Sequence, residues 1–194
     1  IALMTATDGL GAEFVGKVKS FFAVPLDDRG KPNPTLFNVL FPEHTISKAN
    51  IDLYKRRMGE DWENSASRFV TTARSQKLEA PTLHAISLKS STSGWHYDIG
   101  KYDDCVSNSN SGPGTTQEQR DSVRQSIDLA RSLIEPSGFH DNVGTPYNEQ
   151  DTYSHQLLKV SKKNRLKTLI KPARVLKPEN KRKKKDELVE ADYH

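Results

Sequence analysis

The chain has 194 residues, of which 34% are hydrophobic and 28% charged, and its formal net charge is +4. This length allows one domain, or one domain with an arm. The single cysteine, Cys105, excludes a disulfide framework and a cysteine-based zinc cluster, and no run of apolar residues approaches the roughly 20 that cross a membrane.

Blocks of apolar residues separated by turn residues predict alternating strands and helices. We expect strands at residues 1–7, 83–88, 96–106, 139–143 and 166–176, and helices at residues 11–22, 50–57, 116–134 and 151–158. Loops are expected at residues 25–34, 90–94 and 107–116. This alternation predicts an α/β fold with a parallel sheet. Because the first residues already form a strand, we expect the chain to be a piece of a longer protein.

Helix boundaries follow from capping residues. Asn50 is the candidate cap of the second helix. Thr116, with Gln119 three residues later, forms a capping-box pattern at the start of the long third helix. The segment Pro136-Ser137-Gly138 is expected to end that helix.

Positive charge is concentrated near the C-terminus. Residues 159–185 contain 13 Lys and Arg against one acid, Glu179, and carry +12, whereas the other 167 residues contain 16 basic and 24 acidic side chains and carry −8. An acidic body with a basic end suggests a polyanionic partner. Taken alone, the run Lys181–Lys185 is better explained as a solvated tail.

Two adjacent acids, Asp103 and Asp104, end a predicted strand beside a polar loop. Ligands of open parallel sheets bind beyond the carboxyl ends of the strands. One carboxylate can hold Mg²⁺ through its water shell, and its neighbour can orient an attacking water. In isolation, a solvent-facing turn or a helix cap explains the same pair.

A second candidate motif is Gly144-Thr145, which follows the predicted strand at residues 139–143. It would place a hydroxyl and a backbone N–H at the same sheet edge as Asp103, where such a residue can sense a phosphate. An ordinary β-turn with Pro146 at its second position is the alternative.

Residues 11–17 match G-x-x-x-x-G-K after a predicted strand, but they do not fit a phosphate loop. Val18 stands where Ser or Thr must reach Mg²⁺, and Glu13 would repel phosphate. The apolar spacing from Phe14 to Phe22 predicts an amphipathic helix instead.

The order of the motifs carries a family resemblance. The relevant segments, in chain order, are Trp95-His96-Tyr97-Asp98, Asp103-Asp104, the loop with Asn108 and Asn110, Thr116 to Arg120, Ile134 to Phe139, Val143 to Tyr147, and Asp151-Thr152-Tyr153. This series resembles the ATPase domain of the large terminase subunit of tailed bacteriophages, the motor that pumps DNA into empty capsids. The likeness runs from Ile1 to Leu158 and continues more loosely to Tyr193.

The resemblance implies roles for four residues. Asp103 matches the Walker B aspartate that holds Mg²⁺, and Asp104 matches the catalytic carboxylate that activates water. Glu is commoner at that position, so the shorter Asp104 is a departure. Gly144 and Thr145 match the coupling motif, with Gly144 assigned to nucleotide binding and Thr145 to catalysis.

The resemblance also implies a fold, cofactors and partners. The fold would be a P-loop NTPase (RecA-like) core that lacks its N-terminal phosphate-loop strand, with a partial ATPase domain at residues 1–158 and a basic segment at residues 159–194 leading toward an absent nuclease domain. The cofactors would be ATP and Mg²⁺. The partners would be double-stranded DNA, the phage portal and the small terminase subunit, in a homo-oligomeric ring in the host cytoplasm at the procapsid, with no membrane.

Two other functions remain open. The first is a non-enzymatic nucleic-acid-binding module that uses the basic C-terminal arm. The second is a metal-dependent nuclease that uses four carboxylates: Asp98, Asp103, Asp104 and Asp141. Strand alternation would put Asp98 and Asp104 on one face and Asp103 on the other, which is a poor cage for two metals.

Overall fold

The computed structural model describes residues 1–90 and 94–155, which lie within one compact unit, Ile1–His155. The strand expected at residues 166–176, the end of the helix expected at residues 151–158 and the basic segment at residues 159–194 lie outside the described residues, as do residues 91–93.

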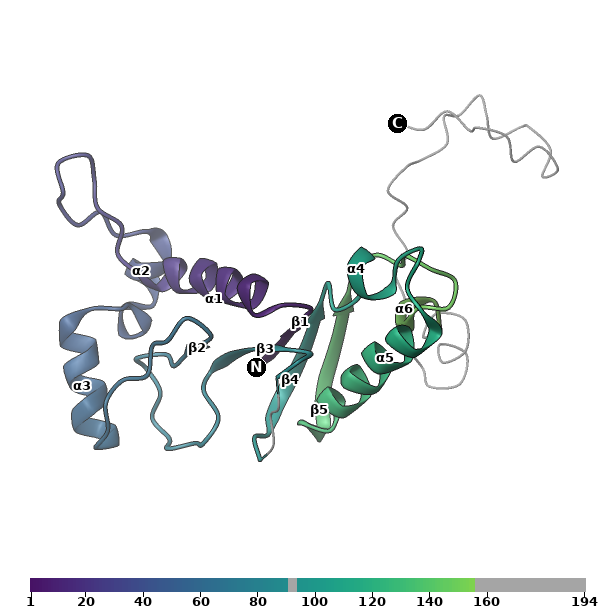
Figure 1. The fold of residues 1–194 in the computed structure, drawn as a ribbon. Helices are drawn as coiled ribbons and strands as arrows, with labels where there is room; N and C mark the ends of the chain where they lie inside the picture. Colours follow the sequence, from purple (N-terminus) through teal and green to yellow (C-terminus); the bar gives the residue numbers. More distant parts are fainter. Residues whose placement is uncertain (91–93, 156–194) are drawn as a thin grey trace, which may run out of the picture. The chain divides into compact units, whose positions relative to one another are not determined.

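A five-stranded, mostly parallel sheet forms the centre of this unit (Figure 1). Its strands are β1 (Ala2–Thr5), β2 (Arg68–Phe69), β3 (Leu83–Ser87), β4 (Tyr97–Asp103) and β5 (Ile134–Val143), in the spatial order β2-β3-β1-β4-β5. The pairs β3–β1, β1–β4 and β4–β5 are parallel, and only β2 runs antiparallel to its neighbour. The α/β prediction is confirmed, whereas the short β2 was not predicted.

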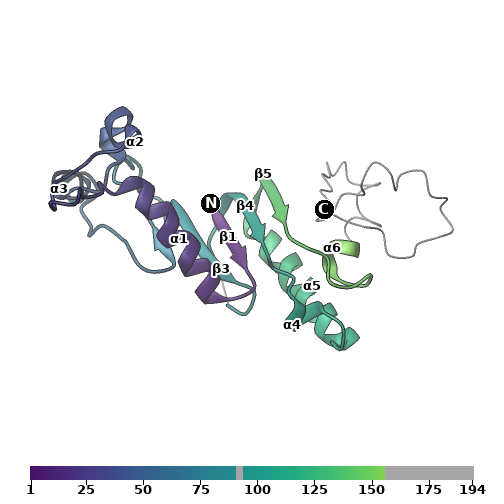
Figure 2. The same ribbon diagram turned by 90° about the horizontal axis from the view of Figure 1, so that it is seen from above.

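Helices cover both faces of the sheet. The described helical segments are α1 (Asp8–Phe22), α2 (Leu36–Leu40), the 3₁₀ turn η1 (Pro42–His44), α3 (Lys48–Met58), α4 (Asn108–Ser111), α5 (Gln117–Arg131) and α6 (Thr152–His155). Of these, α1 packs on one face of the sheet and α5 on the other. Viewed from above, α1 and α5 lie on opposite sides of the strands (Figure 2). The helix after β1 and the helix after β4 thus pack on different faces, so β1 and β4 mark a reversal in the winding of the chain.

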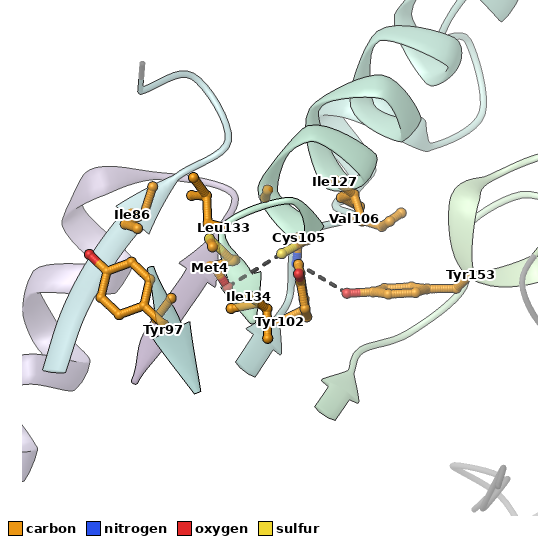
Figure 3. Close-up of a cluster of buried hydrophobic side chains, with 12 residues drawn as sticks. Met4, Ile86, Tyr97, Tyr102, Cys105, Val106, Ile127, Leu133, Ile134 and Tyr153 are labelled. Atoms are coloured by element: carbon orange, nitrogen blue, oxygen red, sulfur yellow. Dashed lines mark hydrogen bonds between the residues drawn. The ribbon is translucent and has the colours of Figure 1, made fainter. Parts of the chain in front are cut away.

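The alternation of side chains along β1 divides the core in two. Leu3 packs with Val15 of α1 and with Phe69, Leu83 and Ala85 on one face. Ala2 and Met4 point to the other face, into the larger cluster, which includes Tyr102, Cys105, Ile127 and Tyr153 (Figure 3). Every side chain of β1 is buried, as expected for a central parallel strand.

Helix α5 begins where the capping box predicts. The Thr116 hydroxyl accepts a hydrogen bond from the Gln119 N–H at 3.2 Å, and the Gln119 side chain accepts one from the Thr116 N–H at 2.8 Å. The predicted cap of α3 is wrong by three residues. Ser47 caps this helix, and the Asn50 side chain instead donates to the carbonyls of Pro42 and Thr45.

The expected role of Pro136-Ser137-Gly138 as a helix stop is also wrong. Helix α5 ends at Arg131, and these three residues lie inside β5. The register between β4 and β5 shifts in this region, from Tyr97 opposite Ile134 to Ile99 opposite Phe139. A sheet edge tolerates proline and an irregular register because the backbone groups on its outer side need no partner strand.

The loop expected at residues 107–116 contains the short helix α4. Ser107 precedes it, and its N–H donates to the Asn110 side chain at 2.8 Å. Among the described helices, none combines the length and the hydrophobicity needed to cross a membrane.

At the amino end of the sheet, His84 is buried and its Nδ1 lies 2.6 Å from the Tyr97 hydroxyl. Trp95 packs on the imidazole, and the Arg68 guanidinium lies 4.6 Å from the centre of the Trp95 ring. Burial, followed by the positive charge of Arg68, lowers the pKa of His84 to about 4. The neutral imidazole therefore belongs to the folded state.

We predict that the folded state loses stability as the pH falls from about 6.5 toward 4, because the unfolded chain then binds a proton that folded His84 does not. The loss is at most about 1.4 kcal/mol for each pH unit. Urea unfolding at about pH 7 and about pH 5 measures it. His84→Gln should reduce the pH dependence. Equal pH dependence in wild type and His84→Gln would contradict this assignment.

Candidate active site at the carboxyl ends of β4 and β5

The two candidate motifs meet at one edge of the sheet. Asp103 is the last residue of β4 and lies opposite Val143, the last residue of β5, in the parallel register. The Asp104 N–H donates to the Val143 carbonyl at 3.1 Å. The paired acids and Gly144-Thr145 therefore follow directly from two hydrogen-bonded strand ends, as the sequence predicts. Asp104, Gly144 and Thr145 are exposed, and Asp103 is half-buried.

Asp104 has a strained backbone. Its φ of +44° makes it the one non-glycine residue with a positive φ within residues 1–90 and 94–155. The left-handed region costs a non-glycine residue about 1–2 kcal/mol, and Asp is among the residues that visit it. Such strain persists only where the surrounding structure imposes it, and it is frequent at functional sites.

This conformation also corrects the expected side-chain alternation. Strand β4 ends at Asp103, and the turn at Asp104 means that period-two alternation does not extend to it. Alternation along β4 therefore does not place Asp98 and Asp104 on one face, contrary to the prediction.

The carboxylate of Asp103 lies in an unfavourable electrostatic environment. Burial raises its pKa, as does the neighbouring Asp104, while Lys101 opposes the shift and Asp141 adds to it. Lys101 is itself engaged, since its Nζ lies 2.6 Å from an Asp141 oxygen. A bound cation would reverse the shift by favouring the ionised carboxylate.

The donor atoms suit Mg²⁺ better than a transition metal. No group of three or more His, Cys, Asp or Glu side chains is arranged to hold a metal ion in the described part of the chain. Asp103 and Asp104 offer carboxylate oxygens only, and Mg²⁺ binds through one or two carboxylates while keeping several waters. The pair therefore fits a water-rich magnesium site.

The four carboxylates of the nuclease alternative do not come together. Asp98 is the second residue of β4 and Asp103 is its last, which separates them by about 16 Å at about 3.3 Å per residue. Asp141 lies opposite Lys101 on the neighbouring strand and pairs with it. The structure thus brings Asp103 and Asp104 together and leaves Asp98 near the other end of the sheet.

Residues 11–17 are helical, as predicted. They lie within α1, and Glu13 pairs with Lys17 at 2.6 Å across one helical turn. The Thr7 side chain caps the helix by accepting from the Leu10 N–H. A helix of this kind has no backbone N–H groups turned inward around a phosphate, so the match to G-x-x-x-x-G-K is incidental.

The loop after Thr145 is fixed by Asp151, a residue that belongs to the motif series above but has no predicted role there. Asp151 is fully buried. Its carboxylate accepts from the N–H groups of Tyr147 at 2.6 Å, Asn148 at 3.1 Å and Ser154 at 2.8 Å. It therefore joins the loop after β5 to the start of α6. This role could not be predicted from the sequence, because the partners of Asp151 are backbone N–H groups, which every residue except proline has.

Position 144 has no room for a side chain, so glycine is required there. A Cβ at this position would lie 2.6 Å from the Tyr153 hydroxyl oxygen, and closer still to the ring. Tyr153, of α6, packs directly over the Gly144 backbone, so any larger residue must displace the ring or the strand end.

A cavity of about 400 Å³ lies beyond the carboxyl ends of two other strands. Its lining comes from the ends of β1 and β3 and from α4 and α5, and includes Ala6, Lys89, Asn110 and Glu118. None of the four candidate residues lines it. Because Asp104, Gly144 and Thr145 are exposed, the candidate active site is open to solvent in the described part of the chain.

Comparison with known protein families finds no family that matches this chain, and comparison with curated proteins finds no match either.

We predict that Gly144→Ala lowers the free energy of unfolding by about 1–3 kcal/mol, because the added methyl group overlaps Tyr153. Urea unfolding measures the change. Gly16→Ala is the matched control: nothing lies within 4 Å of its Cβ position in α1, so it should be neutral or stabilising. Equal stability of Gly144→Ala and wild type would show that Tyr153 does not restrict this position.

Proposed function

We propose that residues 1–158 belong to the ATPase domain of a phage terminase large subunit, a motor that couples Mg-ATP hydrolysis to translocation of double-stranded DNA into a capsid. The observation that carries the proposal is the meeting of Asp103-Asp104 with Gly144-Thr145 at the ends of two adjacent parallel strands. The resemblance in motif order suggests the family, and this juxtaposition supports a common site for its motifs.

Each residue has a role that its position permits. Asp103 would hold Mg²⁺, whose chemistry is to neutralise charge on the phosphates of the nucleotide. Asp104, exposed beyond the strand end, would orient the attacking water. Gly144 would lie against the nucleotide, and the Thr145 hydroxyl, at the start of the loop held by Asp151, would report the state of the terminal phosphate to that loop.

The outer edge of β5 supplies a place for the phosphate-binding strand. Among the described strands β5 pairs only with β4, and its Phe139 and Val143 side chains are 64% and 47% exposed. Beyond Pro136, the backbone groups on the outer side of β5 have no partner strand among the described residues, so a further strand can pair there. A parallel strand at this edge would end beside Asp103 and Thr145, where a phosphate-binding loop is required.

The proposal implies the remaining members of the assembly. These are the portal, the small terminase subunit and further copies of the chain in a ring, working in the host cytoplasm at the procapsid. The basic residues 159–185, with a charge of +12, would lie near DNA in the segment that leads to a nuclease domain.

We predict that the 194-residue chain hydrolyses ATP negligibly, and that the gene encodes a G-x-x-x-x-G-K-S/T loop upstream of Ile1. Protein produced with that segment should hydrolyse ATP with Mg²⁺, and Asp103→Ala should lower kcat at least about 100-fold. Asp98→Ala, near the start of the same strand, is the matched control and should retain activity.

Two results would count against this function. One is an upstream sequence without a phosphate-binding loop. The other is an Asp103→Ala variant that turns over ATP as fast as Asp98→Ala. Magnesium-dependent turnover by the 194-residue chain alone would show that the chain itself holds the residues that contact the phosphates.

The charge distribution favours one second candidate, a nucleic-acid-binding module without enzymatic activity. Here the acidic body would be a scaffold for the basic arm at residues 159–185. This alternative predicts DNA binding that weakens steeply with salt and disappears when residues 159–194 are removed, with no response to nucleotide. A change in DNA affinity caused by Mg-ATP would favour the motor instead.

A further inference from the structure

The hydroxyl of Tyr153 connects the two strand ends that carry the candidate motifs. It accepts a hydrogen bond from the Cys105 N–H at 3.1 Å, directly after Asp104 (Figure 3). It donates one to the Val143 carbonyl at 3.2 Å, directly before Gly144. A single atom thus contacts the backbone that follows the paired acids and the backbone that precedes Gly144-Thr145.

Tyr153 is held firmly enough to act as a fixed support. It is 7% exposed and packs in the larger core cluster with Cys105, Val106 and Ile127. Asp151, two residues earlier, accepts the Ser154 N–H and so fixes the first turn of α6. Burial raises the pKa of the Tyr153 hydroxyl, which therefore keeps the proton that it donates to Val143.

The side chain of Cys105 holds the same segment from the opposite direction. The Cys105 thiol donates to the Met4 carbonyl at 3.3 Å, at the centre of the sheet. The segment after Asp104 is therefore held between β1 and Tyr153. The strained φ of Asp104 lies next to this fixed point, which accounts for how the structure imposes it.

From these contacts we infer that Tyr153 is a positioning residue, which fixes the paired carboxylates of β4 relative to Gly144-Thr145 of β5 through its hydroxyl. The inference rests on the proposed function for its purpose, since a metal on Asp103 and a phosphate at Thr145 need a constant separation. Its geometric content, the linking of two strand ends by one hydroxyl, can be tested without any activity.

The test is Tyr153→Phe in the 194-residue chain, followed by NMR-detected amide hydrogen exchange. The ring still packs on Gly144, while both hydrogen bonds are lost. We expect the Cys105 amide to exchange about fivefold faster or more, the scale of one lost hydrogen bond, and the Asp104 amide to follow it. Amides of β1 and β3 should keep their wild-type rates.

Tyr102→Phe is the matched control. Tyr102 is fully buried on β4 in the same core, and its hydroxyl lies 3.4 Å from His140 rather than at a strand end. This variant should leave the Cys105 amide unchanged. The inference is overturned if Tyr153→Phe leaves Cys105 protected, or if all sheet amides accelerate together, as they would in a generally destabilised protein.

Mn²⁺ titration of the same samples separates the inference from the proposed function. Wild type should show paramagnetic broadening centred on Asp103 and extending to Gly144, and Tyr153→Phe should need several-fold more Mn²⁺ for the same effect at Gly144. Equal titrations of the two proteins would overturn the positioning role. If wild type shows no broadening at Asp103, the metal-binding role of Asp103 in this chain fails, and the exchange rates alone decide whether Tyr153 links the strand ends.

Discussion

The pairing of β4 with β5 is the constraint on which the candidate site depends. Asp103 lies opposite Val143, so β4 and β5 end side by side. The hydrogen bond from the Asp104 N–H to the Val143 carbonyl is the last one between the two strands. A slip of one residue would turn every side chain of one strand to the other face of the sheet. Tyr97 and Tyr102 of β4 are buried in the core and so determine the register of this strand. The register in turn determines where the two acids lie.

At the carboxyl ends of β4 and β5, the side toward the core is packed and hydrogen-bonded, and the other side is exposed to solvent. Toward the core, Cys105 donates its thiol to the Met4 carbonyl and its backbone N–H to the Tyr153 hydroxyl. The loop after Thr145 is held by the buried Asp151. Toward solvent, Asp104 and Thr145 are exposed. Reacting groups held by a packed shell yet accessible from one direction suit a site that must bind and release a ligand.

Charges are also unevenly distributed, both around Asp103 and along the chain. Burial raises the pKa of Asp103, and the neighbouring Asp104 carboxylate adds to the shift. Lys101, the cation nearest in sequence, is engaged with Asp141. Such an arrangement favours a cation from outside the chain. The acidic body and the basic segment at residues 159–185 carry opposite charges, so the two parts of the chain suit ligands of different sign.

The sequence by itself determined the α/β class, the limits of β1, β3 and α1 to within a few residues, and the capping box of α5, because periodicity and capping act over a few neighbouring residues. It also placed Asp103 and Gly144-Thr145 at strand ends. Only the tertiary structure decided the strand order, the irregular β5 that accommodates Pro136, and the contacts of Tyr153 and Asp151 with distant backbone groups. Those contacts join residues as many as 48 positions apart, and local sequence carries no record of which backbone group a buried side chain will meet.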